Sequence, residues 1–212
     1  MAILIILIVM CVVLISEGER KIPVQYAKRV VGRKMYGGQS THIPVKVNMG
    51  GVMPIVFASA VLAIPSTISL FFGNGGESGI TNFFQNTTGG FILYLVIQSA
   101  LILIFAYFYN QIQFNTVEYA KQLQQNGGFI PGIRPGKPTS EYLGKVATRI
   151  TFIGSIALAL LTIIPAIASK LLGLSLSFGG SSVIIVVGVI IETIKQLEAM
   201  MTMKQYKGFL NR

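Results

Sequence analysis

A chain of 212 residues would ordinarily fold into one or two soluble domains. Here 52% of the residues are apolar, 11% are charged and the mean hydropathy is +0.69, which excludes a globule with a polar exterior. The formal net charge of +10 comes from 17 Lys and Arg against 7 Asp and Glu. The composition predicts a polytopic membrane protein of the all-α class, a bundle of transmembrane helices.

The first apolar segment, Ala2 to Ile15, would be about 21 Å long as a helix, against a hydrocarbon core of about 30 Å. A signal peptide is the competing interpretation, but a basic start is missing and Ser16 to Glu19 is a poor cleavage site. We therefore expect a short first span over about residues 1–16, with its outer end cut off. The only cysteine, Cys11, lies inside it, so no disulfide is predicted.

A hydrophilic segment over residues 17–46 follows, with seven basic residues against two acidic ones, and is expected in the cytoplasm. Residues 47–72 form the second predicted span, although Pro65 and several hydroxyl residues interrupt it. Ser59 and Ser66 are seven residues apart and fall within about 20° of each other on a helix. This mildly polar face is not expected to contact lipid.

Charge alternates along the rest of the chain. The remaining spans are predicted at about residues 90–110, 150–169 and 178–194, with a second cytoplasmic loop at 111–149 and a tail at 195–212. Counted from the first loop to the tail, Lys and Arg number seven, none, five, one and four. The positive-inside rule then gives five spans with the amino end outside and the carboxyl terminus in the cytoplasm. An odd count that begins with a short helix suggests the back portion of a larger protein.

The second basic loop contains a stretch rich in Gly and Pro, Asn126 to Thr139 (NGGFIPGIRPGKPT), through which neither helix nor strand is expected to run. Arg134 and Lys137 stand on this stiffened loop and would suit phosphate or an acidic protein surface. The competing interpretation is that basic residues only set the topology. That interpretation is weaker for Arg33, Lys34 and Arg134, because topology requires charge but no rigid framework to hold it.

Catalysis is poorly supported, so an enzyme is not predicted. The only histidine, His42, lies in a loop, and no His, Cys and carboxylate pattern has metal-ligand spacing. We expect neither a cofactor nor a metal. Glu192 is the one acid near a span. A role in an ion path would require this carboxylate to lie at membrane depth. Because Glu192 is close to the tail, we expect its side chain to reach the cytoplasmic interface instead.

Three stretches of the two cytoplasmic loops carry a family resemblance: ERKIPVQYAKR from Glu19, QSTHIPVKVNM from Gln39 and GFIPGIRPG from Gly128. In this order they resemble the SecY family of bacterial protein-conducting channels. The resemblance covers essentially the whole chain, which looks like the last five of the family's ten spans. It implies one half of a clamshell in which two five-helix halves close around an hourglass pore.

The resemblance also implies site residues within the membrane. A ring of aliphatic side chains at the waist of the pore would include Val56 on the second span and Ile185 on the fifth. The second and third spans would form this half's wall of a lateral gate, with Ser59, Ala60 and Ile64 on its surface. The implied function is conduction of unfolded polypeptides across the bacterial cytoplasmic membrane in the general secretory pathway, with lateral release of apolar segments into the lipid bilayer.

On the cytoplasmic side, the resemblance implies docking of the ribosome, through its RNA and protein, or of the SecA motor. The residues that would carry it are Arg33, Lys34, Arg134 and Lys137. Further implied partners are small SecE and SecG-like membrane subunits, the nascent or precursor polypeptide, and the amino-terminal half of the same channel, without which this chain should form no pore.

Two other functions stay open at this point. Half of a secondary solute transporter would hold its substrate at broken helices near the bilayer midplane, and it predicts polar groups at depth in the spans. Apart from Glu192, this chain carries no charge at such a depth. An intramembrane enzyme would need a nucleophile and a base at depth, whereas His42 lies in a loop.

Overall fold

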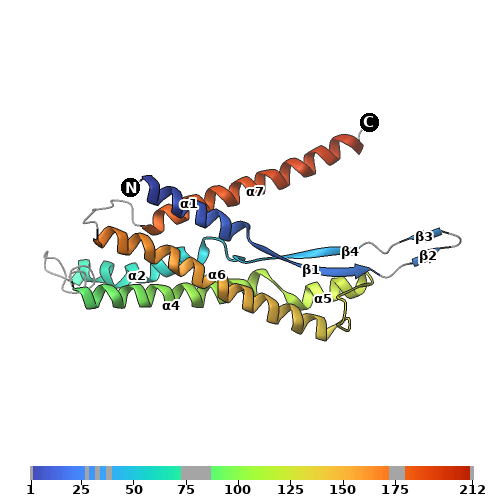
Figure 1. The fold of residues 1–212 in the computed structure, drawn as a ribbon, viewed down its shortest axis with the longest axis horizontal. Helices are drawn as coiled ribbons and strands as arrows, with labels where there is room; N and C mark the ends of the chain where they lie inside the picture. The colour runs from blue at the N-terminus through green and yellow to red at the C-terminus, as the bar shows by residue number, and fades with distance from the viewer. Residues whose placement is uncertain are drawn as a thin grey trace.

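The computed structural model describes residues 2–26, 29–31, 34–36, 40–72, 87–171 and 180–210 of the chain (Figure 1). The chain is mostly helical, which confirms the predicted class. The helices are α1 (Ala2–Glu17), α2 (Met53–Phe72), α4 (Thr88–Gln113), α5 (Thr116–Gln125), α6 (Lys137–Leu171) and α7 (Gly180–Leu210). The strands are β1 (Glu19–Tyr26), β2 (Arg29–Val31), β3 (Lys34–Tyr36), β4 (Ser40–Lys46) and β5 (Gly128–Phe129).

Each of the five predicted spans coincides with a helix. Two helical stretches in the described parts, Thr88–Gln125 and Lys137–Lys170, are long and apolar enough to cross a membrane. Two shorter apolar helices, Ile6–Glu17 and Met53–Ile68, accompany them. The helices α2, α4 and α6 lie side by side, and α1 packs with α7 on the other side of α6 (Figure 1). The number of spans stays a prediction.

The helices do not end where the apolar segments end. Helix α6 begins at Lys137, well before the expected span at 150–169, and α7 continues past 194 to Leu210. Hydropathy marks the part of a helix that suits hydrocarbon, but an amphipathic helix continues wherever its apolar face finds a partner. In α6, Leu143, Val146 and Ala147 supply that face outside the apolar segment, and all three are buried.

Neither a helix nor a strand runs through the whole of residues 126–139, as predicted, although β5 and the start of α6 lie within this stretch. Gly128 and Phe129 form β5, which pairs with β1. Helix α6 already begins at Lys137, because a proline is tolerated in the first helical turn, where its missing N–H would have no partner. Helix α2, by contrast, begins only at Met53, after Gly51 takes a left-handed backbone conformation with φ +59°.

An antiparallel β-hairpin occupies the segment that the sequence assigned to the first cytoplasmic loop, and it was not predicted. Strands β1 and β4 pair in register from Glu19 opposite Lys46 to Gln25 opposite Ser40. Ile22 and Val24 alternate with exposed residues and are buried. Figure 1 shows β1 and β4 running alongside α5 and the beginning of α6, with β2 and β3 at the far end of the hairpin, beyond the helices. Strand β5 adds a third strand beside β1.

The described residues form two hydrophobic cores, which we name after the predicted location of their elements. The first, which we call the cytoplasmic core, joins the hairpin, α5 and the first half of α6, and contains Ile22, Val24, Val45, Phe114, Leu123, Ile130, Leu143, Val146, Ala147 and Ile150. The second, the membrane core, joins all five long helices and contains Ile8, Val12, Ile55, Ala58, Ile102, Leu158, Leu161 and Ile184. Among the residues that the structure describes, α6 is the one helix that contributes to both clusters.

Between the two cores, α6 lies against the connection from β4 to α2. A Cβ atom at Gly154 would collide with the backbone carbonyl oxygen of Val47 and would lie 3.0 Å from the Val47 Cγ1 atom. Val47 is fixed from the other side, because its N–H donates to the carbonyl oxygen of Gly18 at 2.8 Å. Gly154 therefore permits an approach that any other residue would prevent.

We predict that Gly154→Ala destabilises the protein by about 1–3 kcal/mol, the usual cost of forcing an extra group into a packed interior. The new methyl group meets backbone, which cannot move aside by rotating a side chain. The measurement is the thermal unfolding of the detergent-solubilised protein. Gly144→Ala on the same helix is the matched control, since its Cβ would meet only Thr116 Cγ2 at 4.0 Å; equal stability of the two variants would contradict the prediction.

Candidate functional site

The stretch that carries Arg134, residues 126–136, consists of turns on both sides of the short strand β5, and we call it the basic loop. Its glycines Gly127, Gly132 and Gly136 have φ values of +69°, +84° and +103°, a region in which side chains are strained. The N–H of Ile133 donates to the carbonyl oxygen of Ile130 at 3.0 Å. The predicted turn chemistry of this stretch is therefore present in the structure.

The basic loop is also attached to the cytoplasmic core at two points. Ile130 is buried within that core, and Ile133 packs against it. At the carboxyl end, the hydroxyl of Thr139 donates to the carbonyl oxygen of Arg134 at 2.8 Å, and Thr139 is itself only 2% exposed. Arg134 is thus held by its backbone while its side chain is exposed, as is that of Lys137.

The hairpin and the basic loop form one sheet. Gln25 pairs with Phe129 and Tyr26 with Gly128, so β1 leads toward the far end of the hairpin while β5 leads into the basic loop. In the small sheet at that far end, Lys34 pairs with Val31. The side chain of Lys34 and the whole of Arg33 lie outside the described residues. The structure therefore connects the two predicted docking segments through β1, and the role of their basic side chains stays a prediction.

The predicted ring residues lie beside the contact between α2 and α7. Ile55 and Ile184 are each 1% exposed and belong to the membrane core. Their successors are the two predicted residues: Val56 is 37% exposed, and Ile185 is half-buried and packs against the same core. Because neighbouring residues on a helix differ by about 100° in direction, Val56 and Ile185 lie toward the edge of this contact.

The predicted gate residues lie on α2 beyond this contact. The hydroxyl of Ser59 donates within its own helix, to the carbonyl oxygens of Ile55 at 2.8 Å and Val56 at 3.0 Å. Ala60 and Ile64 are exposed. A hydroxyl that is satisfied by its own backbone leaves a face that is only weakly polar, as the sequence suggested. A gate role for these three residues stays a prediction.

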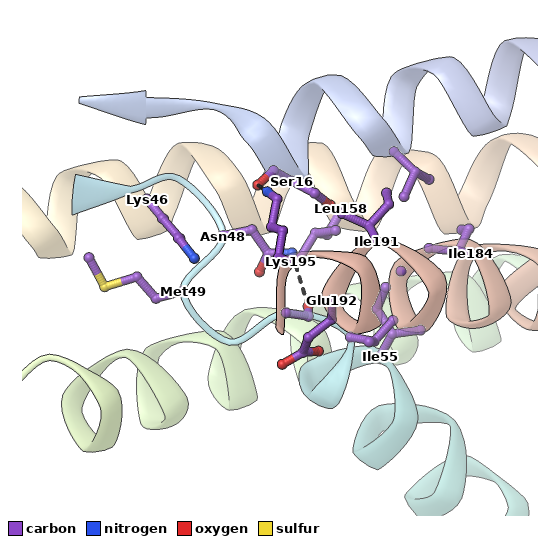
Figure 2. Close-up of a pocket in the computed structure, with 14 residues that line it drawn as sticks. Ser16, Lys46, Asn48, Met49, Ile55, Leu158, Ile184, Ile191, Glu192 and Lys195 are labelled. Atoms are coloured by element: carbon purple, nitrogen blue, oxygen red, sulfur yellow. Dashed lines mark hydrogen bonds between the residues drawn. The ribbon is translucent and has the colours of Figure 1, made fainter. Parts of the chain in front are cut away.

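An open recess lies where the end of α1, the start of α2 and α7 meet (Figure 2). Its base is apolar, and its polar side chains include Lys46, Asn48, Glu192 and Lys195. The ammonium group of Lys195 donates to the carbonyl oxygen of Ser16 at 3.2 Å, near the end of α1 where helical carbonyls lack partners. Glu192 therefore lies in the same recess as Lys46 and Lys195 and is exposed there. This placement disfavours a role for Glu192 in an ion path through the apolar interior of the bundle.

In the described part of the chain, no three His, Cys, Asp or Glu side chains lie close enough together to hold a metal ion. Histidine 42 pairs with Pro23 in the hairpin and is exposed there.

The sequence comparisons decide the family. A profile of the SecY family matches residues 1–194. The chain belongs to the SecY family. Its relatives include the protein translocase subunit SecY of Streptomyces galbus. That protein is 46% identical, and the match covers 96% of this chain and 47% of the relative. The SecY subunit of Thermotoga maritima is 42% identical, and the match covers 95% of this chain and 45% of the relative. The subunit of Thermus thermophilus is 44% identical, and the match covers 93% of this chain and 45% of the relative. This chain spans about half the length of the curated SecY relatives it matches.

Solved SecY structures share the fold. One, described as the structure of a protein-conducting channel, matches with a TM-score of 0.65 at 20% identity and covers 93% of this chain and 48% of that one. Another concerns a SecY protein whose plug domain stabilises the closed state of the translocation channel. It matches with a TM-score of 0.64 at 20% identity, and the match covers 93% of this chain and 49% of that one. These matches show that the chain shares its fold with about half the length of each of those chains.

Two features of the SecY site escaped sequence reasoning. The hairpin was missed, although Ile22 and Val24 on one strand and Ile43 and Val45 on the other alternate with polar residues or proline, which is a strand pattern. The close packing at Gly188 was also missed, because a glycine inside an apolar run shows no sign of which helix approaches it.

We predict that Thr139→Val loosens the basic loop without disturbing its core contacts, because valine keeps the shape but lacks the hydroxyl donor. A typical hydrogen bond contributes about 1 kcal/mol, so amide exchange over residues 130–140 should accelerate about fivefold. Hydrogen–deuterium exchange measured by mass spectrometry provides the test. Thr148→Val, at an exposed position on the same helix, is the control; equal exchange in the two variants would refute the role of the Thr139 hydroxyl.

Proposed function

We propose that this chain forms the carboxyl-terminal half of a protein-translocase channel, which conducts unfolded polypeptides across the bacterial cytoplasmic membrane. The observation that carries the proposal is 42–46% identity to SecY translocase subunits over nearly the whole chain. Conduction is passive in this proposal: the chain catalyses no reaction, and a partner supplies the energy.

The neck of the channel would be formed by Val56, Ile185 and residues of the other half. Apolar side chains at a constriction hinder ions by dewetting, while they bind a moving polypeptide only weakly. The supporting geometry is the packed contact between α2 and α7, which places both residues at its edge with Val56 partly accessible.

A lateral gate would open along α2, with Ser59, Ala60 and Ile64 on its surface and α4 beside it. An apolar segment leaving the channel needs a seam that neither binds it strongly nor seals permanently. The exposed Ala60 and Ile64, together with a Ser59 hydroxyl already bonded to its own helix, fit such a seam. Small SecE and SecG-like subunits and the amino-terminal half would cover other faces of the bundle.

The cytoplasmic docking surface would consist of the basic loop with Arg134 and Lys137, together with Arg33 and Lys34 of the hairpin. Exposed cations on a fixed backbone lose little entropy when they bind phosphate or carboxylate groups. The proposed partners are the ribosome, through RNA phosphates and proteins at its exit, or the SecA motor. The sheet formed by β1 and β5 would let one partner engage both segments.

We predict that Arg134→Glu in the complete channel lowers its affinity for the docked motor or ribosome about tenfold or more, equivalent to roughly 1.4 kcal/mol. The charge is reversed while the loop keeps its backbone contacts. Co-sedimentation of partner with reconstituted vesicles and precursor uptake into them are the measurements. Lys121→Glu, an equal charge change at an exposed position on α5, is the control. Unchanged binding and uptake with Arg134→Glu would disprove the docking role.

A further inference from the structure

Helix α7 packs closely against Val52, the residue just before α2, at a glycine. A Cβ atom built on Gly188 would lie 2.7 Å from Val52 Cγ1, 3.3 Å from Val52 Cγ2 and 3.6 Å from Val52 Cβ, whereas ordinary contact begins at 3.4 Å. Val52 is 7% exposed and therefore enclosed. The absence of a side chain at Gly188 is what permits this spacing between the two helices.

A change of rotamer would relieve the contact only in part. A rotation about χ1 that turns a hydrogen of Val52 toward the Cγ1 position still leaves a methyl group at the Cγ2 position, 3.3 Å from the missing Cβ. Valine is also a stiff side chain at this torsion, so such a rotation has a cost of its own. In the present rotamer of Val52, a larger residue at position 188 would have to push α7 away by most of an ångström.

This contact lies one helical turn from the proposed neck. On α2, the N–H of Val56 donates to the carbonyl oxygen of Val52 at 3.2 Å, so Val56 stands one turn after Val52 on the same face. On α7, Ile185 stands three residues before Gly188, again on the same face. Because α2 and α7 run in opposite directions, both steps lead the same way along the bundle, away from Glu192 and Lys195.

We propose that Gly188 is a positioning residue that sets the width of the channel neck. By letting α7 settle against Val52, it brings Ile185 and Val56 close enough to share one constriction. The proposal rests on the proposed channel function and adds to it a residue that touches neither the polypeptide nor the docked partner. Gly188 acts only through the spacing of α2 and α7.

The test measures ion leak through the complete closed channel in planar bilayers, alongside precursor uptake into vesicles. Gly188→Ala should raise the closed-state leak several-fold and leave uptake in place. Adding Val52→Ala to Gly188→Ala removes the methyl groups that the new side chain meets, and should return the leak to that of Val52→Ala alone. Gly144→Ala is the control for the helix-stabilising effect of replacing glycine by alanine. Val52→Leu enlarges the other side of the same contact and should also raise the leak.

The outcomes separate this inference from the function on which it rests. A wild-type channel that takes up no precursor would overturn the proposed function itself. Normal uptake with an unchanged leak in both Gly188→Ala and Val52→Leu would overturn the role of Gly188 alone. A leak that persists in the Gly188→Ala, Val52→Ala double variant would also overturn it, because the effect would then not depend on the Val52 contact. If Gly188→Ala fails to assemble, the leak of Val52→Leu and of the double variant still tests the role of Gly188.

Discussion

The structure depends on one helix passing through two hydrophobic cores. Helix α6 has 35 residues and is about 52 Å long, well beyond a hydrocarbon thickness of about 30 Å. Its first half packs in the cytoplasmic core and its second half in the membrane core. At the boundary, Gly154 lets α6 lie directly on the Val47 carbonyl, just before α2 begins. The sheet and the helical bundle are thereby joined by packed contacts as well as by covalent connections.

This arrangement connects the basic loop to the helical bundle through packed elements. The loop is fixed to the sheet through β5 and to α6 through Thr139. The sheet leads through β4 and Val47 into α2, which carries the proposed neck and gate residues. A second set of contacts, at Gly188 and at the Lys195 bond to Ser16, seats α7 against α2 and α1. In the proposed channel, a partner bound to the basic loop would therefore act on a half whose elements move together.

Sequence reasoning predicted the helical membrane class, the helix behind each apolar segment and the turns around Arg134, because hydropathy and Gly or Pro chemistry are local properties. It missed the hairpin. The alternating Ile and Val residues of its strands lie in a segment that was interpreted only from its positive charge, as a cytoplasmic loop. Sequence reasoning also did not foresee that α6 begins at Lys137, before the predicted span, because Leu143 and Val146 lie outside the apolar segment and are buried by packing against other elements. The contacts at Gly154 and Gly188 could not be predicted from the sequence, because they depend on which elements pack against each other.

The central claim is that a polypeptide passes along the edge of the α2 and α7 contact. A photo-crosslinking amino acid placed in turn at Val56, Ile185 and Ile153 of the complete channel, with a precursor arrested during translocation, tests it most directly. Ile153 is 66% exposed on α6 and provides an apolar comparison away from that contact. The account predicts crosslinks to the precursor from Val56 and Ile185 and none from Ile153. Crosslinks from Ile153 alone, or equal yields from all three positions, would contradict it.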